Sequence, residues 1–489
     1  MIYGHDPRTG EAVGAALPET DSAGVDTIVS AAAAAGAAWR ATPAAERALA
    51  LEAVADALAA NVDELWQLAD QETALGEVRL RGEVARTAGQ FRLFAQVLRD
   101  GGYTEAIIDH ADASLAPPRP DVRRMKHPLP GVVAVFAASN FPFAFSVAGG
   151  DTASALAAGC PVVVKAHPGH PNTSEQVAKI VREALPNADL LGLVQGMQAG
   201  IDLVQHPGVV AAGFTGSVAG GKAIQRLIDE REVPIPFYGE LGSVNPVVVL
   251  PSAPAKEVAA GFAGSVTLGV GQFCTNPGLM FVPEGDELRD ALVEAVEGTS
   301  GGPMLAERIR DGYVGGVDRL GELRLLAEGK PGEGNWAVTP KVFIADLDTF
   351  EEKLPRIAEE CFGPASIVVT YREISDLRPV LEQLEGSLTA TVHSAEPDEA
   401  GDVVEVLRRK AGRLIWNGWP TGVAVCWAMQ HGGPWPAATT TSTSVGATAI
   451  ERWLAPTAYQ DWPEALLPDE LKDSNPLSIP RRVDGRMEA

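Results

Sequence analysis

The apolar and polar positions between residues 25 and 99 follow a helical spacing. Apolar residues recur three and four positions apart from 44 to 65, among good helix formers, and Pro43 marks a break before them. The pattern continues from 66 to 99, where Gly76 and Gly89 are possible breaks. We therefore expect a layer of helices, preceded by a turn-rich and extended segment over residues 1–25.

Short apolar runs alternate with amphipathic segments between residues 131 and 230. We expect strands at residues 131–136, 160–165, 190–194 and 209–214. We expect helices at residues 151–158, 174–185 and 218–228. Strands that alternate with helices form parallel sheets with helices on both faces. This part of the chain therefore predicts a parallel, Rossmann-like sheet, with a turn at residues 137–142.

The alternation of strand and helix restarts after residue 240. Strands are expected at 247–250 and 279–282, helices at 255–266 and 286–297, and this second α/β unit runs to about residue 416. Residues 103–130 instead contain short alternating runs with several prolines, which indicate strands that leave the main body. A Thr- and Ser-rich tract at 439–445 precedes a helix around 448–454 and a proline-rich tail.

Composition narrows the class of protein. The chain has 489 residues, of which 46% are hydrophobic and 21% are charged, as in a soluble enzyme too large for one core. The formal net charge of −25 argues against binding of nucleic acid through a basic face. The uncharged stretches 127–150 and 258–283 are interrupted by Pro, Gly, Asn or Gln, so we interpret them as buried chain and not as membrane spans.

The cysteines and the first residues predict a cytoplasmic protein with reduced thiols. Cys160, Cys274, Cys361 and Cys426 show no paired spacing typical of disulfides. The sequence contains no CxxC or HExxH motif, and the histidines at 167 and 170 have no nearby Cys or His to complete a site, so we expect no bound metal. Residues 1–6 lack the basic and apolar segments of a signal peptide.

Two candidate catalytic residues, Glu240 and Cys274, lie 34 positions apart in Gly- and Pro-rich surroundings. Backbone N–H groups in such turns can face a substrate, and a thiolate there would be a nucleophile. A lone cysteine is, however, more often an inert buried thiol. Burial would raise the pKa of the Glu240 carboxyl and suit it to act as a general base, whereas its alternative role is to cap a helix or pair with an arginine.

Six short motifs occur in a fixed order along the chain. They are Ser-Asn140-Phe-Pro, Val-Val-Val-Lys165, Phe214-Thr-Gly-Ser217, Glu240-Leu-Gly, Gly-Gln-Phe-Cys274 and Glu359-Glu360-Cys-Phe362-Gly-Pro. Each motif is weak alone, but together, over residues 20–460, they resemble the aldehyde dehydrogenase superfamily. The resemblance implies an α/β fold with a Rossmann-type cofactor domain, an α/β catalytic domain and a small β oligomerisation flap.

The resemblance also predicts how the chain is divided. Residues 1–102 and 131–240 would form the cofactor-binding domain, and residues 241–430 the catalytic domain. Residues 103–130 and 448–489 would form the oligomerisation flap and the tail. A flap of this kind implies a homodimer or a homotetramer.

Three catalytic roles follow from the resemblance. Cys274 matches the nucleophile that forms a thiohemiacetal and then a thioester, and Glu240 matches the base that activates water to hydrolyse the thioester. Asn140 matches the side-chain amide that holds the oxyanion together with the backbone N–H of Cys274. Such donors contribute roughly 3–4 kcal/mol each. By itself, Asn140 would be interpreted as a turn-forming residue.

The cofactor is implied to be NADP, with NAD as the alternative. The matching segment Phe214-Thr215-Gly216-Ser217 precedes an expected helix, whose first N–H groups can receive a pyrophosphate. Lys165 would contact the adenosine ribose, and Glu360 the nicotinamide ribose, with Phe362 close by. Many NAD-using relatives carry a Glu three residues after the lysine, where this chain has Pro168. Without that carboxylate a 2′-phosphate meets no repulsion.

The substrate is implied by a narrower resemblance. The run from 138 to 155, the cysteine segment and His-Gly-Gly-Pro-Trp-Pro at 431–436 are similar to an NADP-type subgroup that contains 2,5-dioxovalerate (α-ketoglutarate semialdehyde) dehydrogenases. This predicts oxidation of a dicarboxylate semialdehyde, with α-ketoglutarate semialdehyde giving 2-oxoglutarate. Candidate pocket residues are Phe141, Phe273, His431 and Trp435, the last two near the substrate entrance. The sequence does not identify the arginine that a second carboxylate requires.

Three alternatives stay open at this point. A long-chain fatty aldehyde is a second candidate substrate. A CoA-acylating relative would intercept the thioester with a thiol, but such enzymes usually lack the base that Glu240 matches. A catalytically silent binding or structural protein on the same fold would have lost Cys274, Glu240 or Asn140, and all three are present.

Overall fold

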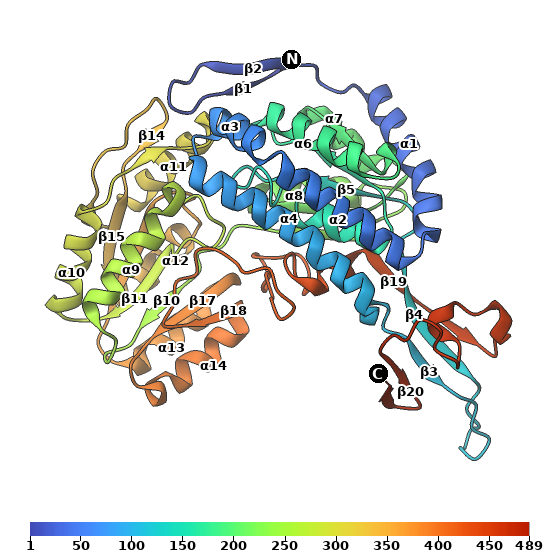
Figure 1. The fold of residues 1–489 in the computed structure, drawn as a ribbon. Helices are drawn as coiled ribbons and strands as arrows, with labels where there is room; N and C mark the ends of the chain where they lie inside the picture. The colour runs from blue at the N-terminus through green and yellow to red at the C-terminus, as the bar shows by residue number, and fades with distance from the viewer. Residues whose placement is uncertain (489) are drawn as a thin grey trace.

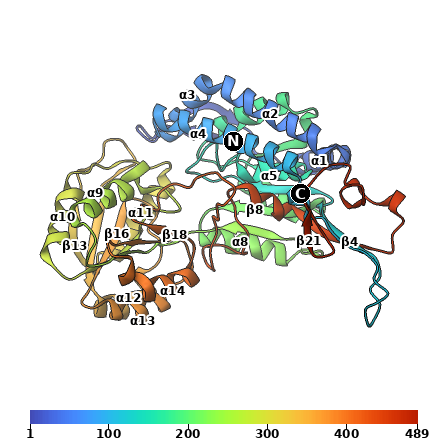
Figure 2. The same cartoon turned by 60° about the horizontal axis from the view of Figure 1, so that its bottom comes forward.

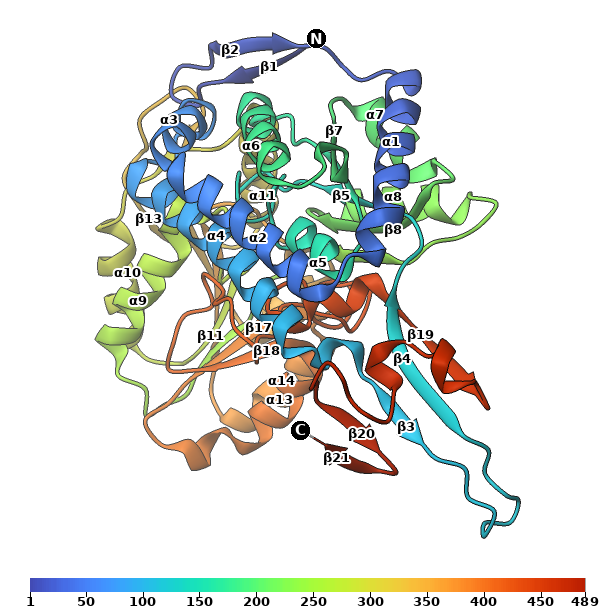
Figure 3. The same cartoon turned by 45° about the vertical axis from the view of Figure 1, so that its right-hand side comes forward.

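Three large β-sheets organise residues 1–488, which are the residues that the computed structural model describes. Two sheets are the centres of α/β units that lie side by side, and the third projects from the body as an arm (Figure 1). Figure 2 and Figure 3 show the arm projecting in the same way from other directions. None of the described helices has the length and apolar character needed to cross a membrane.

A hairpin and four helices open the chain. Their bounds are β1 (Ile2–His5), β2 (Ala12–Leu17), α1 (Ser22–Ala41), α2 (Ala44–Ala60), α3 (Val62–Thr73) and α4 (Glu77–Asp100). Pro43 separates α1 from α2 and Gly76 precedes α4, as expected. The prediction of a possible helix break at Gly89 is wrong, because α4 continues through this residue with its buried face intact. One helical glycine costs about 1 kcal/mol, which the packing of this face offsets.

The first α/β unit contains a five-stranded parallel sheet in the order β7–β6–β5–β8–β9. Its strands are β5 (Val132–Phe136), β6 (Val162–Lys165), β7 (Leu191–Val194), β8 (Val209–Thr215) and β9 (Phe237–Glu240). Its helices are α5 (Gly150–Ala158), α6 (Pro171–Ala184), α7 (Met197–Gln205) and α8 (Val218–Asp229). Valine-rich strands are buried on both faces, against α5 and α6 on one side and α1, α7 and α8 on the other. The predicted Rossmann-like sheet is confirmed.

The second unit contains a seven-stranded sheet in the order β13–β15–β16–β11–β10–β17–β18, in which only β13 runs antiparallel to its neighbour among the described strands. Its strands are β10 (Val247–Val249), β11 (Leu279–Pro283), β13 (Arg324–Glu328), β15 (Lys341–Asp346), β16 (Ala365–Tyr371), β17 (Ser387–His393) and β18 (Ala411–Trp416). Its helices are α9 (Ala255–Thr267), α10 (Asp286–Glu297), α11 (Glu307–Leu320), α12 (Leu347–Ile357), α13 (Ile374–Gln383) and α14 (Gly401–Lys410). A short pair, β12 (Gly302–Pro303) and β14 (Ala337–Val338), lies beside it.

The projecting arm is a five-stranded sheet in the order β19–β4–β3–β20–β21. Its strands are β3 (Ile107–Asp109), β4 (Val122–Pro128), β19 (Leu454–Gln460), β20 (Arg481–Val483) and β21 (Arg486–Glu488). Two segments that are far apart in the sequence therefore form one sheet, because strands of the C-terminal tail pair with strands within residues 107–128.

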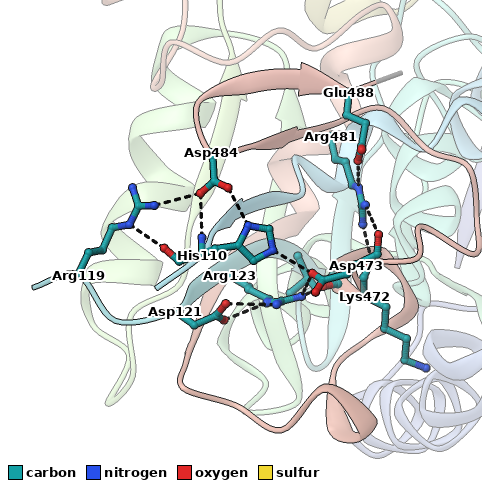
Figure 4. Close-up of polar contacts among 10 residues, drawn as sticks. His110, Arg119, Asp121, Arg123, Lys472, Asp473, Arg481, Asp484 and Glu488 are labelled. Atoms are coloured by element: carbon teal, nitrogen blue, oxygen red, sulfur yellow. Dashed lines mark hydrogen bonds and ion pairs between the residues drawn. The ribbon is translucent and has the colours of Figure 1, made fainter. Parts of the chain in front are cut away.

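Polar contacts around His110 hold the C-terminal hairpin on the arm (Figure 4). Nδ1 of His110 lies 2.7 Å from Oδ2 of Asp484, and Nε2 lies 3.2 Å from Oδ1 of Asp473. Arg119 donates to the backbone oxygen of His110 and to Asp484. Hydrogen bonds to Asp484 and then to Asp473 raise the pKa of the His110 imidazole.

The segment before the tail lies elsewhere than predicted. We expected residues 448–489 to belong to the flap and tail, but residues 447–453 form a 3₁₀ helix in the core of the first unit. Trp453 is fully buried there and donates to Ser154 of α5. The arm therefore begins at Leu454 on this side, while the functional division into domains stays a prediction.

Candidate active site

Candidate residues gather at the carboxyl ends of the first sheet. β5 leads into the loop that carries Asn140, β6 ends at Lys165, β8 ends at Thr215 and β9 ends at Glu240. Ligands of open α/β sheets bind outside this edge, where strand order reverses. The order β6–β5–β8 places such a reversal beside β5. Residues spread over a hundred positions of sequence therefore share one edge.

Cys274 lies in a tightly constrained loop between α9 and β11. Gly269, Val270 and Gly271 before it all have positive φ, between 56° and 66°, and the β-branched Val270 is strained in this conformation. After this turn, the side chain of Asn245 donates to the backbone oxygens of Cys274 at 2.8 Å and Asn276 at 3.0 Å. Asn245 is itself fully buried. These contacts determine where the thiol can point.

Glu240, His431 and Cys274 form a cluster in which the first two are buried and Cys274 is half-buried. Nε2 of His431 lies 2.9 Å from Oε1 of Glu240 and 3.7 Å from Sγ of Cys274. The hydroxyl of Ser444 donates to Oε2 of Glu240. We expected His431 near the substrate entrance, but its side chain is fully buried against Glu240 and Cys274. It turns inward because its backbone N–H and C=O bond to Thr443 and Ser444.

The charges in this cluster differ from the expectation. Burial raises the pKa of the Glu240 carboxyl, but the charge of His431 and hydrogen bonds from His431, Ser444 and Cys274 outweigh burial, so the pKa is lowered. Burial, followed by the charge of Glu240, raises the pKa of the Cys274 thiol well above its usual value. The resting cluster therefore holds a protonated thiol beside an ionised carboxylate.

The same three side chains bring their donor atoms within 4.8 Å of one another. A thiol, an imidazole and a carboxylate are ligands that zinc accepts. They come from positions 240, 274 and 431, so a search for closely spaced ligands in the sequence could not find them. A metal there would occupy the sulfur that the nucleophile role requires, so we interpret the cluster as an acid–base group.

Asn140 and two aromatic residues lie directly beside Cys274. Nδ2 of Asn140 donates to the backbone oxygen of Gln272 at 2.9 Å, two residues before the cysteine. The rings of Phe141 and Phe273 meet edge to face at 5.4 Å. The structure thus brings the predicted amide and these two predicted pocket residues to the nucleophile loop.

The segment from Phe214 to Ser217 can receive a phosphate. Ser217 caps α8 through a hydrogen bond from Gly220 at 3.1 Å, and both Gly216 and Ser217 are exposed. A Cβ at position 216 would lie 2.6 Å from Cζ of Phe214, so a larger residue would require that ring to move. Backbone N–H groups at a helix start attract anions. This arrangement fits the pyrophosphate of a dinucleotide.

Lys165 belongs to a cationic cluster that the sequence did not indicate. Nη2 of Arg308, in the first turn of α11, lies 2.7 Å from Nε2 of His167. Burial, and then the charge of Arg308, lowers the pKa of Lys165 to about 8. Neither Lys165 nor Arg308 forms an ion pair with a described carboxylate, and Pro168 lies exposed next to His167.

Glu360 and Phe362 line a small cavity together with Ser243 and Phe273. Burial raises the pKa of Glu360 to about 8, and a hydrogen bond from the Ser243 backbone partly offsets this effect. A Cβ at position 242 would overlap the carboxylate. The two predicted cofactor residues therefore share one cavity beside the nucleophile loop.

Trp435 is half exposed, and its ring lies 5.7 Å from Nζ of Lys222 on α8. This contact directs it toward the start of α8, so its place in the substrate pocket stays a prediction. Ser444 was missed altogether, because a Thr- and Ser-rich tract looks like a linker in sequence. The available signal was a pair of adjacent hydroxyl residues, Thr443 and Ser444, which follow His431 by 12 and 13 positions.

Comparisons with known proteins identify the family of this chain. The model of the aldehyde dehydrogenase family matches residues 2–455. Alpha-ketoglutaric semialdehyde dehydrogenase 2 of Azospirillum brasilense is 48% identical over 470 residues, covering 92% of this chain and 89% of the relative. Alpha-ketoglutaric semialdehyde dehydrogenase of Acinetobacter baylyi is 44% identical over 438 residues, covering 86% and 83%.

Solved structures share the fold. A 1-pyrroline-5-carboxylate dehydrogenase from Thermus with bound NAD superimposes with a TM-score of 0.80 at 22% identity, covering 94% of this chain and 89% of the other. A gamma-glutamyl-gamma-aminobutyraldehyde dehydrogenase from Burkholderia cenocepacia gives 0.82 at 24% identity, covering 94% and 92%. With a family match over nearly its whole length, the chain belongs to the aldehyde dehydrogenase family and is an NAD(P)-dependent oxidoreductase that converts aldehydes to acids.

Proposed function

We propose that this protein oxidises α-ketoglutaric semialdehyde to 2-oxoglutarate and prefers NADP to NAD. Two relatives that carry this substrate in their names support the choice, at 48% and 44% identity over most of both chains. The observation that carries the chemistry is the buried contact of Cys274, His431 and Glu240 at the end of β9.

Glu240 is the base of the first step. The neutral thiol of Cys274 loses its proton to the ionised carboxylate, while His431 and Ser444 hold that carboxylate from two sides. The thiolate then adds to the aldehyde carbon and the carbonyl oxygen becomes an oxyanion. The lowered pKa of Glu240 and the raised pKa of Cys274 make this transfer unfavourable without substrate, which keeps the thiol protected until an aldehyde binds.

The oxyanion forms close to Asn140. One N–H of its amide is bound to the Gln272 backbone, and the second is available to the oxyanion together with the Cys274 backbone N–H. Donors already oriented in a buried site stabilise developing charge more than water does. We therefore assign Asn140 to oxyanion binding, in place of the turn-forming role that its sequence context alone suggests.

Hydride loss leaves a thioester on Cys274. When bound, the nicotinamide supplies the acceptor for this hydride. Glu240 first releases the proton of the thiol to solvent and then takes a proton from water, and the resulting hydroxide attacks the thioester carbon. The carbon–sulfur bond breaks, the carboxylic acid is released and the thiol is regenerated. The balance is one aldehyde, one water and one oxidised cofactor, giving one acid, one reduced cofactor and one proton.

The preference for NADP is supported by Lys165 and Arg308. Both cations lie beside exposed Pro168, at the position where an acidic residue would repel a 2′-phosphate. Arg308 occupies the first turn of α11, where the helix dipole disfavours a cation unless an anion is near. A phosphate bound between Lys165 and Arg308 would form ion pairs with both side chains and would bridge the first α/β unit and the second.

The experiment that tests the function is a substrate panel read by the absorbance of the reduced cofactor. The purified protein is given α-ketoglutaric semialdehyde, succinic semialdehyde and a long-chain aldehyde. We expect the highest kcat/KM with the first. A higher value with the long-chain aldehyde would overturn the assignment.

Cys274→Ala should lower kcat by roughly 10⁴-fold or more, because no other group can form the thioester. Cofactor binding, measured by fluorescence titration, should persist. The exposed Cys426 supplies the matched control, since Cys426→Ala removes a thiol without touching the cluster. Turnover by Cys274→Ala would remove this residue from the nucleophile role.

We also propose that the projecting arm mediates assembly into a homodimer or a homotetramer. It is a sheet that extends from the body (Figure 3). Light scattering on the eluted protein distinguishes these states from a monomer.

A further inference from the structure

Helix α4 presents two arginines to the active site. Arg79 and Arg86 are seven positions apart and therefore lie on one face of the helix. Arg79 lies over the rings of Phe141 and Phe273, and Arg86 lies 5.8 Å from the ring of Phe145. That last ring is 6.3 Å from the ring of His431.

Arg86 is a buried cation that lacks a carboxylate partner. Its Nη1 donates to the backbone oxygen of Val423, while Nε and Nη2 are buried without a hydrogen-bond partner among the described residues. Glu83, one turn away, uses Oε1 to accept from the N–H groups of Phe143 and Ala144. No described ion pair includes Arg86, although the chain has 64 acidic and 39 basic residues and most of its described arginines are paired.

Such an arrangement costs stability in the free protein. A buried guanidinium that keeps two N–H groups unpaired loses hydration without a replacement. Burial accordingly lowers the pKa of Arg86, and the nearby charges of Glu83, Cys274 and Glu240 partly restore it. Sites built for a charged ligand carry this kind of cost, because the ligand supplies the missing partner.

Two other arginines near Cys274 fit a carboxylate less well. Nη2 of Arg79 donates to the backbone oxygen of Asn140 at 2.6 Å. Nη2 of Arg413 on β18 donates to Pro420 and Gly422. In a guanidinium, Nε–H and one Nη2–H are parallel and form the edge that binds both oxygens of a carboxylate. Of the three, Arg86 alone has both atoms of this edge unpaired among the described residues.

We propose that Arg86 binds the carboxylate of the aldehyde substrate through Nε–H and Nη2–H, at the end of the substrate remote from the reacting carbonyl. Arg86 thereby selects semialdehydes that carry a carboxylate over uncharged aldehydes of the same length. This inference rests on the proposed function, and it supplies the cationic anchor that the sequence did not identify.

The test compares Arg86→Met with the unaltered protein on two five-carbon aldehydes, α-ketoglutaric semialdehyde and pentanal. Methionine keeps the length and apolar stem of the side chain but removes the charge. We expect kcat/KM for the semialdehyde to fall by about 100-fold, mainly through a higher KM, because the carboxylate loses a bidentate partner. The value for pentanal should change by less than about threefold.

Two further variants make the result specific. Arg92→Met, on the exposed side of α4 where Arg92 pairs with Asp56, should leave both values unchanged. Arg86→Lys keeps the positive charge but lacks the guanidinium edge with two parallel N–H groups. It should retain part of the preference for the semialdehyde. Glutarate, a dicarboxylate without an aldehyde, should inhibit the unaltered protein competitively and inhibit Arg86→Met at least about tenfold more weakly.

Three results would overturn the proposal. An equal loss for both aldehydes would mean that Arg86 only holds the loop at Val423. An undiminished preference for the semialdehyde in Arg86→Met would place the anchor elsewhere and leave the proposed function intact. A higher kcat/KM of the unaltered protein for pentanal than for the semialdehyde would overturn both the proposed function and the role of Arg86 in binding the substrate carboxylate.

Discussion

Two buried carboxylates at the active site differ in charge because their neighbours differ. Glu240 lies beside His431 and accepts hydrogen bonds from His431, Ser444 and Cys274, so its pKa lies below the usual value despite burial. Glu360 has one backbone donor, so burial dominates and raises its pKa to about 8. Paired groups whose environments move their pKa values apart take different chemical roles. Glu240 is thus ionised and able to accept a proton near neutral pH, whereas Glu360 can donate a hydrogen bond.

Arg308→Ala should weaken binding of 2′,5′-ADP by about tenfold or more and change binding of 5′-ADP little, because only the first ligand carries the 2′-phosphate. Calorimetric titration measures both ligands. Affinity for 2′,5′-ADP should also fall as pH rises through about 8, since Lys165, whose pKa is lowered to about 8, then loses its charge. Arg310→Ala is the control, because Arg310 lies on the same helix and pairs with the adjacent Asp311. An equal loss for both ligands would contradict the role in NADP preference.

At the scale of elements, the loop that carries Cys274 depends on the segment that follows β9. Asn245 lies in that segment with φ of 48° and joins three parts of the chain. Its amide nitrogen holds the cysteine loop, and its oxygen accepts from Thr389 on β17 and from Ser243. The positive φ values of residues 269–271 make the loop costly, and these buried hydrogen bonds help to offset that cost.

Asn245→Ala should destabilise the fold by about 2–3 kcal/mol, because it leaves buried carbonyl and hydroxyl groups unpaired. Thermal denaturation measures this effect. The rate of alkylation of Cys274 by iodoacetamide should rise, since the loop loses its anchor. Asn417→Ala is the matched control, because Asn417 also has a positive φ and two hydrogen bonds but lies exposed in another segment. Unchanged alkylation with lowered stability would separate Asn245 from the positioning of the thiol.

At the scale of the whole molecule, the active site is closed by the returning chain. After β18 the backbone crosses back to the first unit, where Leu241 donates to the oxygen of Ala437 and Thr439 bonds to the edge of β9. This return brings His431 and Ser444 to Glu240. The tail then continues to the arm, where His110 connects β3 to the C-terminal hairpin (Figure 4).

The attachment of the β20–β21 hairpin to the arm should be more stable below pH 6.5 than above the raised pKa of His110. The folded pKa of His110 is raised, so its protonation adds stability below the ordinary value of 6.5, and this stability is lost as pH rises through the raised pKa. Hydrogen exchange of residues 481–488, corrected for the intrinsic effect of pH, measures the change. His110→Gln should show weaker protection at low pH and little further change with pH. The same pH dependence in that variant would exclude His110 as its source.

The sequence by itself determined the α/β architecture and most element positions. Valine runs at 162–164 and 247–249 are buried strands whatever follows them, and Pro43 and Gly76 act locally on the backbone. The predicted helix break at Gly89 is wrong because a local signal does not include tertiary packing. Burial of one face of α4 stabilises the helix more than the glycine destabilises it. The motifs around Glu240 and Cys274 were also recognisable, because each is a short continuous segment.

Only the tertiary structure decided which charges meet. His431 and Ser444 contact Glu240 across about 190 and 200 positions of sequence, and Arg86 and Arg308 reach the active site from helices far apart in the chain. A pKa depends on burial and on neighbours within a few ångströms, which have no signature in residue spacing. For this reason sequence alone placed His431 at the entrance and left the substrate carboxylate without an anchor. The structure places Arg86 and Arg308 where we propose that the substrate carboxylate and the 2′-phosphate bind.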